Sequence, residues 1–206
     1  MRESLPRGGR AFVSRYWYFS ATLPGLLFGA PPPFSDEEYL FRCKRLMEEK
    51  DYFELSQAIE SLLAKKPISA QRSAFLRNFI AWERTLRNEL SRLRARKAER
   101  NEEEYLRTSE PRDEAGRTAA ACYAVEDPYQ AELFLERERW NAIERMSSLS
   151  SFDVDFLIAY RLKLAINARL ERLNVESGSA GYHHLYSDIL GRATRTAETQ
   201  DLGEKA

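Results

Sequence analysis

The sequence predicts an all-α fold, a helical bundle with long antiparallel helices and an extended N-terminal strap. Residues 69–100 contain neither glycine nor proline, and large apolar side chains recur there in steps of three and four residues: Phe75, Phe79, Trp82, Leu86, Leu90 and Leu93. This spacing is typical of an amphipathic helix, because it places the apolar side chains on one face. Residues 152–174 include the run Phe156–Tyr160, which has no polar member and is typical of a central helix. Alternation typical of a strand is suggested only at Tyr16–Ser20.

The stretch YWYFSATLPGLLFGAPPPFSDEEYL, Tyr16 to Leu40, combines rigid aromatic rings with two proline breaks. Prolines exclude a continuous helix, and the apolar content is too high for a solvated linker, so we expect residues 16–34 to lie against the bundle as the strap. The apolar patterns predict three core anchors, Trp17, Trp82 and Trp140. Aromatic rings beside a proline-rich bend are also typical of a partner-binding ridge, so Trp17 and Tyr18 are candidate partner-binding residues.

Local signals predict where the first helices begin and end. Ser35 followed by Glu38 is a capping-box pattern and predicts a helix start. Asp51 with Glu54 repeats the pattern of a cap followed by an acid, which predicts a second helix ended by Pro67.

The predicted organisation has three parts: a flexible N-terminal extension over residues 1–15, a single helical domain over residues 16–192, and a disordered tail over residues 193–206. A loop near residues 108–117 contains proline, glycine and charge, and is expected to separate two helical halves. A short helix over residues 119–125 and a long helix opening at Asp127–Pro128 are predicted to follow it.

Composition predicts a globular protein with a charged exterior. Hydrophobic residues make up 43% of the chain and charged residues 31%, and the mean hydropathy is -0.56. Thirty-two basic residues balance thirty-two acidic ones, so no net field attracts nucleic acid or an anionic membrane. Cys43 and Cys122 stand in no paired motif, which favours a reduced, cytoplasmic protein. The apolar run over residues 23–34 is broken by proline and glycine, so we expect no membrane span and no secretory signal.

No pattern in the sequence predicts catalysis, a metal site or a cofactor. Phosphate-binding glycine loops and nucleophile–base spacings are absent from the sequence, so we expect no enzyme activity. His183 and His184 are adjacent, so on a helix they diverge by about 100° and cannot share one metal ion. Asp153 and Asp155 are better explained as acids in the first turn of a helix than as a catalytic pair.

A cluster of basic residues follows the strongest helical pattern: Arg84, Arg87, Arg92, Arg94, Arg96, Lys97 and Arg100. Interspersed glutamates at spacings of three and four favour a solvated, self-paired helix face over a nucleic-acid interface. Docking to an acidic protein surface is the more favoured functional interpretation. The candidate partner-binding residues of this cluster are Arg84, Arg87, Arg94, Arg96 and Lys97.

Three segments together resemble a family of small helical proteins associated with bacterial V/A-type rotary ATPases: residues 16–40, EDPYQAELFLERERWNAIERM (residues 126–146), and FDVDFLIAYRLKLAINARLERLN (residues 152–174). With the glycine loop before YHHLYSDIL, the resemblance covers most of residues 16–190. The arginine-containing N-terminal extension and the charged tract over residues 94–105 depart from the family pattern.

The resemblance implies a non-catalytic subunit in the C/d-type position of the ATPase, where it links the membrane rotor ring to the central stalk. Other V/A-type ATPase subunits would then be its partners, and it would be peripheral to the membrane only through the complex. The family offers no catalytic or cofactor-binding residues to carry over. The alternative hypothesis is a free-standing helical adaptor whose arginine-rich helix binds an acidic protein or RNA.

Overall fold

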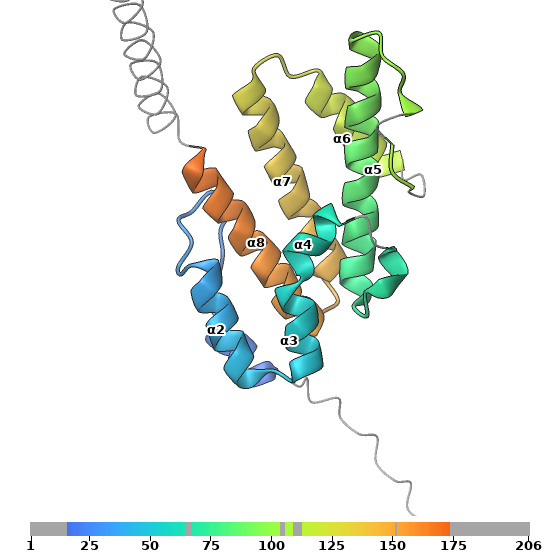
Figure 1. Ribbon diagram of the computed structural model, residues 1–206. Coiled ribbons are helices and arrows are strands. Elements are labelled where there is room, and N and C mark those ends of the chain that lie inside the picture. The colour runs from blue at the N-terminus through green and yellow to red at the C-terminus, as the bar shows by residue number, and fades with distance from the viewer. Residues whose placement is uncertain (1–15, 65–66, 104–105, 109–112, 151, 174–206) are drawn as a thin grey trace, which may run out of the picture. The chain divides into compact units, whose positions relative to one another are not determined.

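The computed structural model describes residues 16–64, 67–103, 106–108, 113–150 and 152–173. Within these ranges the chain forms helices and no strand, which confirms the predicted all-α helical bundle (Figure 1). The strand suggested at Tyr16–Ser20 is wrong, because Trp17–Thr22 is a short helix, α1. Residues 1–167 and 168–206 form two separate units, and the second contributes only the last turn of α8 and Leu173 to the described residues. The predicted extension and tail lie outside them.

The remaining elements follow in chain order: α2 (Asp36–Leu46), α3 (Glu49–Ser56), α4 (Ala58–Leu63), the 3₁₀ helix η1 (Ile68–Ala70), α5 (Ala74–Lys97), α6 (Asp113–Tyr123), α7 (Pro128–Ser147) and α8 (Val154–Arg172). Capping side chains start two of them: Ser35 was predicted as a cap, whereas at Asp127–Pro128 the prediction was proline in the first turn. Ser35 Oγ accepts a hydrogen bond from the Glu38 N–H at 3.2 Å, and Asp127 accepts one from the Tyr129 N–H at 2.9 Å. Helix α5 begins later than expected, because Ser73 is its cap.

The predicted cap at Asp51 is wrong. Helix α3 begins at Glu49, and Asp51 lies inside it with its carboxylate accepting a 2.7 Å hydrogen bond from the Tyr16 hydroxyl. The Glu54 carboxylate accepts backbone N–H groups of Arg72 and Ser73 at 2.6 and 2.7 Å. Both carboxylates therefore accept hydrogen bonds from residues distant in sequence, and neither caps the helix in which it lies.

The predicted loop near residues 108–117 is shorter than expected, because α6 begins at Asp113. Helix α6 packs against α5 and α7, and the side chains of Ala115 and Ala119 are fully buried. Small buried side chains let helix axes approach closely, and this packing offsets the cost of about 1 kcal/mol for Gly116 in a helix.

The core follows the predicted stripes of α5 and α8. Phe75, Phe79, Trp82, Leu86 and Leu90 are buried along α5, whereas Leu93 is only half-buried. Helix α8 is buried over most of its circumference from residue 157 to residue 167, as predicted for a central helix.

The strap after α1 is fastened to α7 and α8. The side-chain amide of Asn167 binds it twice: Oδ1 accepts the Gly29 N–H at 3.0 Å, and Nδ2 donates to the Leu27 carbonyl at 2.9 Å. Tyr160 donates its hydroxyl to the Pro24 carbonyl at 2.9 Å. The Phe28 ring meets Trp140 of α7 edge-on, with centroids 5.7 Å apart. The predicted strap is therefore confirmed over residues 23–34, with α1 as its helical beginning.

Candidate functional site

The predicted partner-binding residues fall into two groups with different neighbours. Trp17 and Tyr18 belong to α1, which is held at α3 by the hydrogen bond between Tyr16 and Asp51. The five basic candidates, residues 84–97, belong to α5, which packs against α6 and α7. Figure 1 shows α2, the helix between α1 and α3 in the chain, and α5 on opposite sides of α8. The two groups are therefore separate candidate surfaces.

Several of the basic candidates on α5 are engaged within the protein. Arg84 donates to the Thr108 carbonyl at 3.3 Å, and Arg87 pairs with Glu83 at 2.6 Å. Arg96 pairs with Glu102, and their hydrogen bond raises the pKa of Arg96 and lowers the pKa of Glu102. Pairing at spacings of three and four was predicted, and Arg87 with Glu83 has it, whereas Arg84 and Arg96 bind groups that lie beyond the end of α5.

The end of α5 carries the remaining basic candidates. The Lys97 ammonium lies 5.9 Å from the centre of the Tyr123 ring. Arg94 is exposed, and with Arg100 it borders a hollow of about 250 Å³. These side chains are the part of the basic cluster best placed to meet an external anion.

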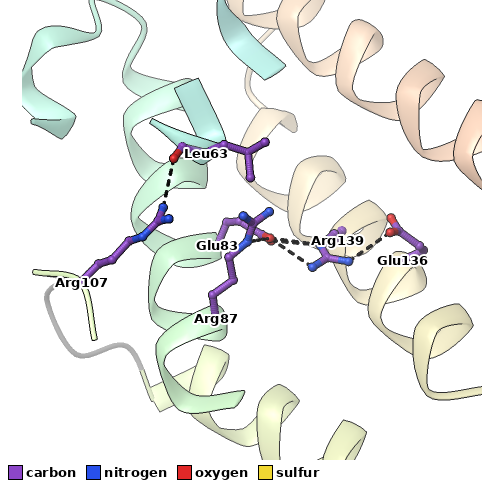
Figure 2. Close-up of polar contacts among 6 residues, drawn as sticks. All are labelled: Leu63, Glu83, Arg87, Arg107, Glu136 and Arg139. Carbon is purple, nitrogen blue, oxygen red and sulfur yellow. Dashed lines mark hydrogen bonds and ion pairs between the residues drawn. The ribbon is translucent and has the colours of Figure 1, made fainter. Parts of the chain in front are cut away.

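An ion cluster with buried carboxylates joins α5 to α7 and consists of Glu83, Arg87, Glu136 and Arg139 (Figure 2). Arg139 donates to both carboxylate oxygens of Glu83 at 3.1 Å and to Glu136 at 3.1 Å. Glu83 is 1% exposed and Glu136 is 2% exposed. Burial is the largest single influence on Arg139 and lowers its pKa. The charge of Glu83, the hydrogen bond to Glu83 and the charges of Glu136 and Glu132 together outweigh burial and raise the pKa above its usual value. Because Arg139 of α7 binds both carboxylate oxygens of Glu83 of α5, the pair fixes the position of one helix against the other.

Sequence reasoning missed the ion cluster. The sequence predicted only that charges three and four positions apart form a solvated, self-paired face, whereas the Glu83 side chain of the pair with Arg87 is 2% exposed. Arg139 is 56 residues away from Glu83, so no local spacing indicates that the two side chains meet. An arginine among the apolar residues of α7 was the available signal.

Two further polar side chains of the described chain also connect distant segments. Arg161 is 2% exposed, forms two 2.8 Å bonds to Asp36 of α2, and donates to the backbone carbonyls of Leu55 and Ser56. Arg107 donates to the carbonyl of Leu63 at 3.1 Å, at the end of α4 (Figure 2). These contacts hold short helices in place through charge-assisted hydrogen bonds.

Five large apolar side chains of α1, α2 and α3 are exposed, and we call them the aromatic surface: Trp17 (55%), Tyr18 (75%), Phe41 (63%), Leu46 (57%) and Phe53 (67%). The predicted core anchors Trp82 and Trp140 are buried, whereas the prediction of a core position for Trp17 is wrong. Aromatic residues are enriched at the anchor positions of protein interfaces. The aromatic surface is therefore the candidate site that the structure favours, and its role in binding remains a prediction.

A hollow of about 210 Å³ lies between residues 23–26 of the strap and the helices that bear Ser147 and Tyr160. Ligand pockets are usually larger, about 300–1,000 Å³. Among the described residues there is no group of three His, Cys, Asp or Glu side chains arranged to hold a metal ion. His183 and His184 lie outside those residues.

The two cysteines are buried, and the two acidic residues at the start of α8 accept hydrogen bonds from backbone N–H groups. Cys43 and Cys122 are free and buried, and burial raises the pKa of the Cys43 thiol to about 12. Asp153 accepts the Phe156 N–H at 2.9 Å, as expected for an acid at a helix start. Asp155 accepts the Phe75 N–H at 3.4 Å and so links α8 to α5.

None of the helices in the described ranges combines the length and the apolar character needed to cross a bilayer. Comparison of the chain with protein-family models, with curated proteins and with solved structures finds no match. The rotary-ATPase resemblance therefore stays a prediction from the sequence.

Proposed function

We propose that the protein is a non-catalytic structural or assembly subunit of a V/A-type rotary ATPase, in the C/d-type position between the membrane ring and the central stalk. The observation that carries the protein-binding part of this proposal is the aromatic surface, which exposes five large apolar side chains on three neighbouring helices. Exposed aromatic side chains of this size mark interaction sites when they lie together. The identity of the partner complex rests on the sequence resemblance.

Stiffness of the bundle supports a mechanical role. The ion cluster fixes α5 to α7, Arg161 fixes α8 to α2 and α3, and Asn167 fixes the strap to α8. Helices held by packing and by buried charged hydrogen bonds deform little, which suits a body that transmits force between a ring and a stalk.

The segments that carry the resemblance contact one another. The strap meets α7 through Phe28 and Trp140, and it meets α8 through Tyr160 and Asn167. Three stretches that are distant in sequence therefore contribute to one packed unit, which supports treating them as a single family pattern.

Buried carboxylates support a structural interpretation over a catalytic one. Asp51 binds the Tyr16 hydroxyl, Glu54 binds two backbone N–H groups, and Glu83 binds two arginines. Catalytic acids and bases usually line a pocket that admits substrate, whereas these carboxylates satisfy groups of the protein itself.

Purification of the rotary ATPase from native membranes, through a tag on one of its catalytic subunits, tests the proposal. We expect mass spectrometry to find this chain in the finished complex or in partly assembled complexes. Its absence from both forms would rule out the ATPase role.

The hollow bordered by Arg94 and Arg100 favours a second candidate function, an adaptor that binds an acidic protein or RNA at the end of α5. Such binding would weaken steeply with added salt, because the contacts are charge-based and exposed. Reversal of Arg94, Arg96 and Lys97 to Glu would abolish it. Binding that is indifferent to salt and to this triple variant would exclude the adaptor.

A further inference from the structure

We propose that the aromatic surface binds an amphipathic segment of a partner protein that carries apolar anchor residues flanked by acidic residues. The proposal rests on the protein-binding role proposed above and adds the chemistry of the partner. It is carried by the position of the exposed rings and by the charges around them.

Tyr16 brings the exposed rings of α1 to the junction of α2 and α3. Its hydroxyl donates to Asp51 at 2.7 Å and accepts the backbone N–H of Glu48, the residue before α3, at 3.4 Å. Trp17 and Tyr18 follow Tyr16 directly in sequence and are exposed, and Leu46 is exposed at the last residue of α2, two residues before Glu48. Exposed apolar side chains therefore flank Tyr16 in sequence on α1 and end α2 just before the junction.

Phe41 and Phe53 extend the surface away from that junction. Phe41 lies five residues before Leu46 on α2, which is a rise of about 7.5 Å and a rotation of about 140°, so Phe41 faces a different side of the helix from Leu46. Phe53 lies five residues after Glu48, at a similar distance along α3. Lys44 and Arg45 follow Phe41 at the i+3 and i+4 positions, so their charges lie on the same face of α2 as the Phe41 ring.

The charge near Phe41 selects an acidic partner. Residues 41–47, FRCKRLM, contain three cations and no carboxylate. Arg42 is paired with Glu38, whereas Lys44 and Arg45 form no ion pair with any carboxylate in the described ranges, and the Arg45 guanidinium lies 5.8 Å from the centre of the Phe41 ring. The helix dipole favours cations at this end of α2, but it does not explain the outward aromatic ring beside them.

Acidic side chains on the same helices disfavour an anionic membrane as the occupant. Glu37 of α2 and Glu49 of α3 are exposed, and anionic lipid would repel both. A protein partner carries charged side chains at defined positions. Its carboxylates can therefore lie opposite Lys44 and Arg45 and away from Glu37 and Glu49.

Two synthetic helical peptides with identical apolar residues test the proposal, one with glutamates and the other with lysines on the flanking positions. We expect the full chain to bind the acidic peptide at least about tenfold more tightly than the basic peptide in fluorescence anisotropy. Lys44→Glu with Arg45→Glu should reverse that preference, and Phe41→Ser or Trp17→Ser should weaken acidic-peptide binding by about tenfold or more.

Matched controls are Leu149→Ser, an exposed apolar residue elsewhere, and Arg145→Glu, an exposed cation of α7. We expect both to bind the acidic peptide as the wild type does, and circular dichroism should show every variant folded. Loss of binding in either control would overturn the assignment of the site.

Equal affinity for the two peptides, or none for either, would overturn the proposal. Binding to vesicles of equal parts phosphatidylcholine and phosphatidylserine without peptide binding would assign the surface to lipid, and self-association lost in Phe41→Ser would assign it to a second copy. Peptide binding combined with absence from the rotary ATPase would remove only the identity of the partner complex. Presence in the ATPase with intact assembly of the Lys44→Glu, Arg45→Glu variant would remove only this inference.

Discussion

The interface of α5 with α7 and the aromatic surface of α1, α2 and α3 distribute charged and apolar side chains in opposite ways. At the interface, Glu83 and Glu136 are buried and satisfied by Arg139. On the aromatic surface, Trp17 and Phe41 are more than half exposed. At the interface of α5 with α7, buried charged side chains hold two helices together. On the aromatic surface, large apolar side chains are exposed to solvent.

This difference shows which region is maintained for stability and which is free for binding. Removing one partner of a buried ion pair leaves a buried charge without compensation, which strongly lowers the stability of the fold. The side chains of such a pair are therefore constrained by folding. An exposed ring contributes little to folding, because it remains in water in the folded state. Variants in the two regions should therefore separate stability from binding.

The largest expected effect is at the interface. Arg139→Met leaves Glu83 and Glu136 without their shared cation, and should lower the free energy of unfolding by about 3–5 kcal/mol in urea titrations. Arg145→Ala is the matched control, because its pair with Glu114 is exposed, and should cost less than about 1 kcal/mol. Similar losses in the two variants would refute a special role for the buried cluster.

A smaller effect is expected where α1 is fastened. Tyr16→Phe removes the hydrogen bond to Asp51, and should cost about 1–3 kcal/mol at neutral pH because that carboxylate is buried. Tyr39→Phe provides a comparison, because its hydroxyl donates to the Leu157 carbonyl instead of a carboxylate. A cost at Tyr16 no greater than that at Tyr39 would argue against a charge-assisted bond.

The same tyrosine gives a pH dependence. Burial, together with the hydrogen bond to Asp51, raises the pKa of Tyr16 from 10.0 to about 12. The unfolded chain therefore loses this proton first, so the stability contributed by Tyr16 is present below pH 10.0 and is lost as the pH rises toward about 12. Denaturation at several alkaline pH values should show a shallower decline for Tyr16→Phe than for the wild type, and an unchanged slope would contradict this.

A local effect is expected at the strap. Asn167→Ala removes both hydrogen bonds to residues 27–29 and should cost about 1–2 kcal/mol. Hydrogen exchange should accelerate at the Gly29 amide while amides in the middle of α5 keep their protection. Uniform acceleration across the bundle would mean that Asn167 supports the whole fold.

The smallest effect on stability is expected on the aromatic surface. Phe41→Ser and Phe53→Ser should change the free energy of unfolding by no more than about 0.5 kcal/mol, because the rings are mostly solvated. A loss of several kcal/mol measured in urea would show that these rings are part of the core.

Features encoded over a few residues could be predicted, and features that join distant residues could not. The cap at Ser35, the helix start at Asp127–Pro128 and the apolar stripe of α5 depend on neighbours within one or two turns. Asp51 resembles a cap in its local setting, but its partner Tyr16 is 35 residues earlier.

The candidate site was predictable only in part. Periodicity placed all three tryptophans in apolar patterns, but only the exposure of Trp17 in the structure shows that it faces outward. Tyr18 was identified from its aromatic and proline-rich surroundings, and it is exposed. Phe41 and Phe53 were missed, because the amphipathic pattern of a short helix is too brief to distinguish the outer face from the inner one.

The fastening of the strap has a consequence for biosynthesis. Gly29 and its partner Asn167 are separated by 138 positions, so a ribosome that adds about 5–20 residues per second completes the second one roughly 7–28 s after the first. During that interval the strap has been synthesised, but the residue that fastens it has not. The nascent chain therefore exposes an apolar N-terminal stretch to chaperones and to prospective partners before the bundle can shelter it.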